Sequence, residues 1–349
     1  MKTIISFCIL YAFAASSAGA CDLCGCYTPQ LQTDNVSTLT EPTAVMHGGG
    51  SGLYGAIGEQ FTHFGTVMVD GREVANPTGQ HEESSITQIV AGYSFNRWLS
   101  VQVNVPLIYR SFKRPEGFAI DQGTESGLGD VSVLAKAVLF HKEALFARKE
   151  SFSNDGKPSL QANYEPDLTV SALLLAGVKF PTGDSSRLKE EFNELDIAGA
   201  PPSGIHGHDL TLGTGSFDGI FGGQASLRYK NLFFEADVQF TLRGDGLYSY
   251  SFANDLTWSG GPGYYFIRRR DSVFGLQFVV SGEHKDTDRF QGRPAVDTGI
   301  TSIFLGPRIV ASIGRFSGEV GVDIPISIDN TALQVVPDYR IRAGLSVRF

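Results

Sequence analysis

The C-terminal eleven residues alternate between apolar and polar side chains, which places each kind on its own face of an extended strand. The apolar face carries Tyr339, Ile341, Ala343, Leu345, Val347 and Phe349. The polar face carries Arg340, Arg342, Ser346 and Arg348. Such a strand separates an apolar surface from a hydrated one. It is typical of the closing strand of a bacterial outer-membrane barrel, which points apolar side chains to lipid and polar ones to the lumen.

Similar segments recur along the chain and predict an all-β protein, a transmembrane antiparallel up-and-down β-barrel of about 12 strands, with about 10 to 14 as the range. The predicted strands are 52–66, 85–96, 98–110, 127–141, 167–180, 216–230, 232–243, 249–267, 272–284, 299–313, 315–327 and 339–349. The first strand is ambiguous, because Glu59 shares a face with Leu53, Ile57 and Phe61, and its facing stays unassigned.

The polar faces of the clearest strands predict the residues that line the lumen, where hydrated charges are tolerated. These are Glu235, Asp237, Gln239, Arg243, Glu319, Asp323, Arg340 and Arg342. Counting outward from a loop expected at 328–336 places Asp323 opposite Arg342 or Arg340, as a cross-strand pair of opposite charge.

The connections alternate in length. Short turns near 96–97, 230–231, 268–271 and 313–315 alternate with longer polar stretches at 67–84, 111–126, 181–215, 285–298 and 328–336. Outer-membrane barrels have short periplasmic turns and long outer loops, so both barrel termini are expected in the periplasm. Residues 142–166 are long where a short turn is due, and predict either a helical excursion or two further strands.

The N-terminus predicts export. Lys2, a short apolar run and Ala18-Gly19-Ala20 form a secretory signal peptide over residues 1–20. Residues 21–50 are expected to be a cysteine-containing lead segment, with 27–50 able to fold inward and obstruct the lumen. Residues 51–349 are expected to form the barrel. No later window of about 18 apolar residues predicts a membrane-spanning helix.

Composition excludes further classes. The formal net charge of −9 gives no support for nucleic-acid binding. Glycine-rich pieces such as 213–215 and 260–263 lack the residues of a phosphate loop, and no G-x-S-x-G elbow is present. The sequence therefore does not predict an enzyme.

Two motifs have metal-binding chemistry. Cys21, Cys24 and Cys26 have three open interpretations: a disulfide with one spare thiol, a soft-metal or redox site for copper or zinc, and lipidation of Cys21. His206 and His208, beside Asp209 in the longest predicted outer loop, could ligate a metal or be solvated loop residues. No other cofactor is indicated.

Three blocks carry a resemblance to a known family: Gly127-Leu128-Gly129-Asp130-Val131, residues 177–185 (GVKFPTGDS) and residues 213–218 (GTGSFD). Their order and spacing resemble those of the phenol-degradation meta-pathway outer-membrane protein family. The resemblance implies a barrel that passes small, often hydrophobic molecules, with no catalytic residues to carry over.

The expected function is an outer-membrane channel or transporter, with membrane lipid and a small-molecule permeant as its partners. The alternative is a non-conducting barrel that anchors a periplasmic metal-binding or redox cysteine segment.

Overall fold

The computed structural model describes residues 51–144, 167–193, 197–269 and 271–349, and its twelve long strands form a closed antiparallel barrel. The strands are β1 (Gly52–Val69), β3 (His81–Ser94), β4 (Leu99–Glu116), β6 (Ser132–Ala144), β7 (Leu168–Lys179), β8 (Asp218–Tyr229), β9 (Leu232–Leu242), β11 (Asp255–Arg268), β12 (Ser272–Lys285), β15 (Ile300–Ile313), β16 (Phe316–Asn330) and β17 (Leu333–Arg348). Each pairs with its neighbours in this order, and β17 pairs with β1 from Tyr54↔Arg348 to Val69↔Leu333. The predicted twelve-stranded barrel is confirmed.

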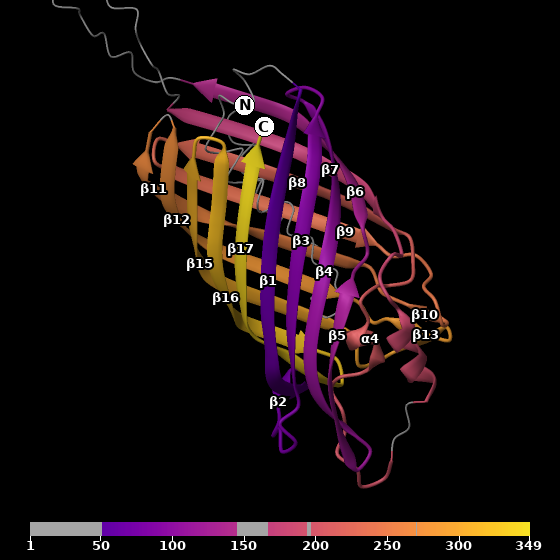
Figure 1. Cartoon of the computed structure of the whole chain (residues 1–349). Helices are drawn as coiled ribbons and strands as arrows, with labels where there is room; N and C mark the ends of the chain where they lie inside the picture. The colour runs from indigo at the N-terminus through magenta and orange to yellow at the C-terminus, as the bar shows by residue number, and fades with distance from the viewer. Residues whose placement is uncertain (1–50, 145–166, 194–196, 270) are drawn as a thin grey trace, which may run out of the picture.

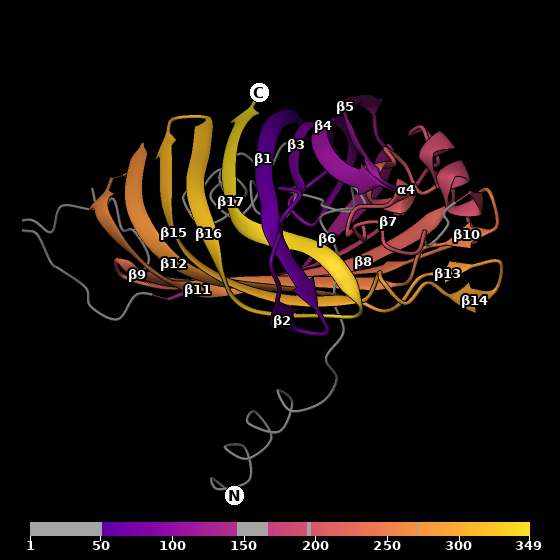
Figure 2. The same ribbon diagram turned by 90° about the horizontal axis from the view of Figure 1, so that it is seen from below.

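The two ends of the barrel differ in their connections (Figures 1 and 2). The turn end is where β1 starts and β17 stops, with tight turns such as Lys230-Asn231. The loop end carries the longer connections and five short strands. These are β2 (Arg72–Glu73), β5 (Ala119–Leu128), β10 (Tyr250–Ser251), β13 (Arg289–Phe290) and β14 (Arg293–Pro294).

The alternation along each strand decides which side chains face outward. Val238 and Val322 on the outer face are 43% and 38% exposed, whereas Glu235 and Arg340 on the inner face are 3% and 2% exposed. An apolar belt on the outside and polar groups on the inside are the reverse of a soluble core, and suit a wall between lipid and an enclosed polar interior.

Glu59 faces outward, and this assigns the facing of the first strand, which the sequence pattern left open. Its neighbours Ile57 on β1 and Ile341 on β17 are exposed apolar residues. The hydroxyls of Ser85 and Thr87 on β3 both donate to the Glu59 carboxylate. Two adjacent hydroxyls thus satisfy the carboxylate on the apolar face of the wall.

Two expected connections differ in the structure. Residues 328–336 are not a long loop, because β16 and β17 continue to a turn at Thr331-Ala332, where the Ala332 N–H donates to Asp70 Oδ1 at 2.9 Å. Residues 111–126 are not a loop, since β4 continues to Glu116 and pairs with β5. In both places polar residues extend the antiparallel strand pairing beyond the predicted end of the strand.

Residues 142–144 belong to β6, so no helix begins at 142; residues 145–166 lie outside the described chain.

The helical segments are short. A 3-10 helix, η1 (Ser186–Phe192), and one turn of α-helix, α4 (Gly207–Leu210), both lie in the connection from β7 to β8. Within the described ranges, no helix has both the length and the apolar character needed to cross a membrane.

Candidate functional site

The connection between β7 and β8 packs against the inner face of the barrel at its loop end. Leu188 of η1, together with Ile205 and Leu210, is at most 1% exposed. Their apolar partners are Phe64, Val67, Phe112, Tyr250, Phe252, Ile300, Val335 and Val336, which come from β1, β4, β15, β17 and the β9–β11 connection. We call residues 186–193 and 197–212 the plug, because this apolar cluster holds them against the inner face at the loop end of the wall.

A buried ionic group, which we call the anchor, fixes both ends of the plug. Lys179 Nζ lies 3.1 Å from Asp130 Oδ2 and 2.8 Å from Asp218 Oδ2. Arg243 Nη1 lies 2.8 Å from the same Asp218 oxygen. Asp130, Lys179 and Asp218 come from the three sequence blocks noted above, one from each block, so the structure brings all three together.

Two glycines let the ends of the connection cross in contact above the anchor. A Cβ atom at Gly183 would lie 2.6 Å from the carbonyl oxygen of Leu212, and one at Gly213 would lie 2.6 Å from Asp130 Oδ1. No larger residue fits either place without a shift. The backbone N–H groups of Gly183 and Thr214 each donate to Asp130 at 2.9 Å, which adds hydrogen bonds to the ionic contacts.

A second contact holds the C-terminal end of the plug against β3 and β4, the strands that follow β6 in the wall. Arg110 of β4 is fully buried, and its Nη1 donates to the carbonyl oxygen of Thr211 at 2.8 Å and to that of Asp209. Its Nε lies 3.6 Å from Glu82 Oε1 on β3. We call Glu82 and Arg110 the latch, since they join the wall to the plug backbone.

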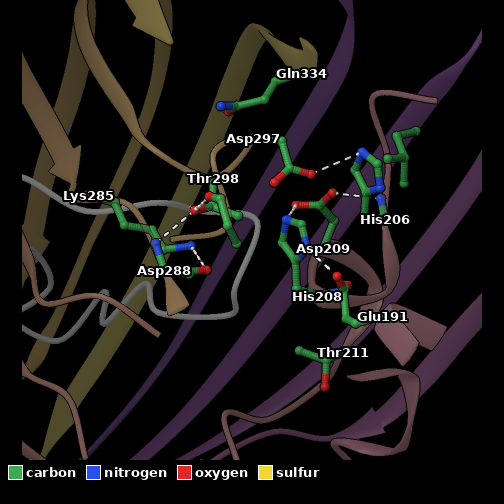
Figure 3. Close-up of polar contacts among 12 residues, drawn as sticks. Glu191, His206, His208, Asp209, Thr211, Lys285, Asp288, Asp297, Thr298 and Gln334 are labelled. Carbon is green, nitrogen blue, oxygen red and sulfur yellow. Dashed lines mark hydrogen bonds and ion pairs between the residues drawn. The ribbon is translucent and has the colours of Figure 1, made fainter. Parts of the chain in front are cut away.

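The two histidines of the plug are engaged by carboxylates (Figure 3). His208 Nδ1 lies 3.0 Å from Glu191 and its Nε2 lies 3.2 Å from Asp209, while His206 Nε2 lies 3.3 Å from Asp297. Burial would lower the pKa of His208, but the carboxylates of Asp209 and Glu191 outweigh it and hold this pKa well above its ordinary value. His208 is therefore a cation at neutral pH inside the plug.

Metal binding by these histidines is not supported by the geometry. Both imidazoles already face carboxylates of the plug and of the β12–β15 connection, and no group of three or more His, Cys, Asp or Glu with metal-ligand geometry occurs in the part of the chain that the structure describes. Cys21, Cys24 and Cys26 lie outside the described residues, as does the lead segment 27–50.

The β12–β15 connection supports the plug from the far side. Asp288 is buried and accepts a hydrogen bond from Lys285 Nζ at 2.6 Å (Figure 3). It accepts another from the hydroxyl of Tyr250 at 2.6 Å. Tyr250 in turn stacks on His208, with ring centroids 5.6 Å apart. The plug is thus braced by charged and aromatic groups from several strands.

Most of the residues expected to line the lumen lie on the inner face in cross-strand contacts. Arg342 Nε is 3.2 Å from Asp323 Oδ2, and Asp323 is directly opposite Arg340 in the register, so the expected cross-strand pair is confirmed. Arg340 itself pairs with Glu283 on β12 at 3.0 Å.

The remaining lumen candidates differ in position. Glu319 Oε2 lies 3.7 Å from Arg308 Nη1 on β15, and Asp237 accepts a hydrogen bond from Ser259 at 2.6 Å. Glu235 and Gln239 are buried on β9. Arg243 lies in the anchor at the loop end, away from the middle of the barrel.

The latch and the apolar cluster were not predicted. Arg110 ends the predicted strand 98–110, and Leu188 and Leu210 fall within the predicted polar connection 181–215. One feature of the sequence could have indicated the apolar cluster. Apolar residues such as Phe64, Phe112 and Ile300 occupy inward positions at the loop ends of strands, where a lumen-facing residue should be polar.

The chain shares its fold with solved outer-membrane proteins. An outer-membrane channel from Pseudomonas putida F1 matches with a TM-score of 0.52 and 12% identity, over 86% of this chain and 96% of that one. The β-domain of the Bordetella autotransporter BrkA matches with a TM-score of 0.41 and 9% identity, over 86% of this chain and 100% of that one. The toluene transporter TbuX of Ralstonia pickettii matches with a TM-score of 0.30 and 9% identity, over 86% and 90%.

A comparison with protein-family models gives no match, and a comparison with curated proteins gives none. At these identities the likeness to the P. putida channel concerns the fold alone. The architecture of this chain is that of a bacterial outer-membrane barrel.

Proposed function

We propose that this protein is an outer-membrane channel or transporter that passes small molecules, hydrophobic ones among them, without catalysing a reaction. The observation that carries the proposal is the polar inner face enclosed by an apolar outer belt, together with an internal segment that packs against the inner face at one end. A barrel that only anchored another segment would not require an internal segment held by its own ion pairs and apolar contacts.

The proposal places the loop end at the cell surface and both barrel termini in the periplasm. The asymmetry of the connections supports this orientation, since short turns face the periplasm in barrels of this class. In this orientation, the plug closes the entrance on the outer side. We also propose, from the three sequence blocks, that the chain is a member of the phenol-degradation meta-pathway outer-membrane protein family. This membership does not identify the permeant.

Removal of the plug tests the function directly. Because the glycines at 183 and 213 are in contact, a short glycine-serine linker can replace residues 186–212 without moving the wall. Purified wild-type and plug-deleted protein would be compared in planar bilayers and in liposomes loaded with small solutes. We expect flux through the plug-deleted barrel to exceed wild-type flux by a large factor. A folded plug-deleted barrel that passes no solute would contradict a channel.

A second function, from another class, is favoured by the dense packing of the inner side chains. Gln60, Arg110 and Arg340 are at most 2% exposed, which is what a non-conducting barrel would show. Such a barrel would anchor the segment of Cys21, Cys24 and Cys26, whose thiolates would hold copper or zinc. Metal content measured before and after thiol alkylation, on protein that shows no flux, distinguishes this function from the first.

A further inference from the structure

A continuous row of polar side chains crosses the inner wall near the middle of the barrel. Gln277 on β12 is opposite Arg308 on β15, Arg308 is opposite Gly321 on β16, Gly321 is opposite Arg342 on β17, and Arg342 is opposite Gln60 on β1. Four of these five neighbouring strands thus contribute two guanidinium groups and two primary amides along one line of the register, and Gly321 on β16 leaves a gap between the arginines. We call Gln60, Gln277, Arg308 and Arg342 the polar row.

The charges of the polar row are compensated locally. Arg308 faces Glu319 and Arg342 faces Asp323, at 3.7 and 3.2 Å. Asp237 on β9 also interacts electrostatically with both arginines. Glu235 interacts with Arg308 as well. Two positive groups and four negative groups therefore lie together, and each arginine faces a carboxylate of a neighbouring strand. An ion of either sign would meet repulsion as well as attraction here, and would lose its hydration.

The hydrogen-bonding capacity of the polar row is not used up. Both amide atoms of Gln60, the Oε1 atom of Gln277 and the Nη2 atom of Arg308 are buried and have no hydrogen-bond partner among the described residues. Gln60 and Gln277 are each only 1% exposed. Buried polar groups left without partners cost free energy, so a molecule that offers both donors and acceptors at this level gains from them.

We propose that the polar row is the selectivity site of the channel and favours small uncharged solutes bearing hydroxyl groups over ions of similar size. The proposal rests on the proposed channel function and assigns its substrate class. A hydroxyl both donates and accepts, so it can bond the Gln60 amide and the free oxygen of Gln277 in turn. It does so without the dehydration that an ion would suffer beside charged groups that are already paired with one another.

The experiment uses the plug-deleted full chain in liposomes, so that the row alone limits passage. The flux of erythritol, an uncharged polyol, is compared with that of potassium and of glutamate. Gln60→Met keeps the length of the side chain and removes its amide, Gln277→Met does the same on β12, and Gln60→Glu adds a charge. Phe61→Leu, on the adjacent outward position, is the matched control.

We expect erythritol flux to exceed that of either ion before substitution. Gln60→Met should lower erythritol flux by about fivefold, the effect of one hydrogen bond, and leave ion flux nearly unchanged. Gln60→Glu should raise the ratio of potassium to glutamate flux, and Phe61→Leu should change nothing.

Ion flux that exceeds erythritol flux, or erythritol flux that both methionine variants leave unchanged, would overturn this proposal while the channel function stands. The absence of flux for every solute through a folded barrel would overturn the channel function, and this proposal with it.

Discussion

At the scale of single residues, position on the wall decides what a side chain contributes. Val322 lies exposed on the apolar outer face, while Asp323 one residue later faces Arg342 inside. Glu59 shows the limit of this rule, because an outward carboxylate is accommodated by Ser85 and Thr87. The alternation in the sequence predicts the facing of most residues but not this local compensation, which depends on a neighbouring strand.

The lipid-facing assignment of Val322 predicts a large cost for charge. We expect Val322→Arg to lower the free energy of unfolding by about 2–4 kcal/mol, because an arginine near mid-bilayer loses hydration. Val322→Leu should have little effect. Urea titration in lipid vesicles measures both variants, and equal stability of the two would show that Val322 does not face lipid.

The ion pairs of His208 predict a pH dependence of the plug. The pKa of His208 is raised by Asp209 and Glu191, so its stabilising effect is complete below the ordinary histidine pKa and is lost as pH rises through the raised value. His206 lies stacked beside it, and Glu82 faces it from β3. We therefore expect the frequency of channel opening to increase toward alkaline pH.

His208→Gln is the variant that isolates this effect. It should open more readily at neutral pH and lose the alkaline increase that the wild type shows. Single-channel recording over a pH series measures this, and an unchanged alkaline increase in His208→Gln would assign the pH dependence to another group.

At the scale of elements, the plug is held by contacts that join distant parts of the sequence. Lys179 ends β7, Asp218 begins β8, and Asp130 precedes β6. Lys179 lies between two buried carboxylates, so its removal leaves both without their shared cation. We expect Lys179→Met to destabilise the plug by about 3–5 kcal/mol, the cost of breaking a buried ion pair.

Protease cleavage within the plug reports this loss without global unfolding. Lys189→Met, an exposed lysine of η1, is the matched control and should be cleaved at the wild-type rate. If Lys179→Met and Lys189→Met behave alike, the anchor does not hold the plug.

The cysteine segment is expected to be dispensable for the barrel. Cys24→Ser combined with Cys26→Ser should assemble normally, because the described wall closes through β1 and β17 without it. Heat-modifiable migration on gels measures assembly. A failure to assemble would show that these thiols support the fold.

The sequence predicted the strands better than it predicted the contacts between residues of different strands. Strands such as 232–243 repeat every two residues and can be recognised alone, since each buries one face. The anchor requires Asp130, Lys179 and Asp218 to meet across three strands, and no local pattern encodes that. The resemblance of the three blocks to a family marked them, but only the closed wall explains why the blocks lie together.

The tight turn at Thr331-Ala332 was missed for a similar reason. The polar residues Asp329 and Asn330 favour a loop, yet Asn330 Oδ1 accepts from the Gly71 N–H at 3.0 Å and lets the strands continue. Its partner lies near the other end of the barrel sequence.

At the scale of the whole molecule, the wall and the plug have separate tasks. The wall provides an apolar exterior and a polar interior, and the plug is held at its loop end by an apolar cluster, the anchor and the latch. The central claim is that passage through the barrel requires the plug to move. A covalent bond between plug and wall tests this claim without removing any contact of the anchor or latch.

The most direct measurement is the conductance of a reversibly cross-linked barrel. A Cβ atom at Gly204 of the plug would lie 3.3 Å from Cα of Gln334 on β17, so the two positions are in contact and are the ones chosen for a cross-link. Gly204→Cys and Gln334→Cys are introduced into protein that carries serine at positions 21, 24 and 26. We expect the reduced protein to open in planar bilayers, the oxidised protein to stay closed, and added reductant to restore opening. Equal conductance in the oxidised and reduced forms, with the disulfide verified, would contradict a plug that must move.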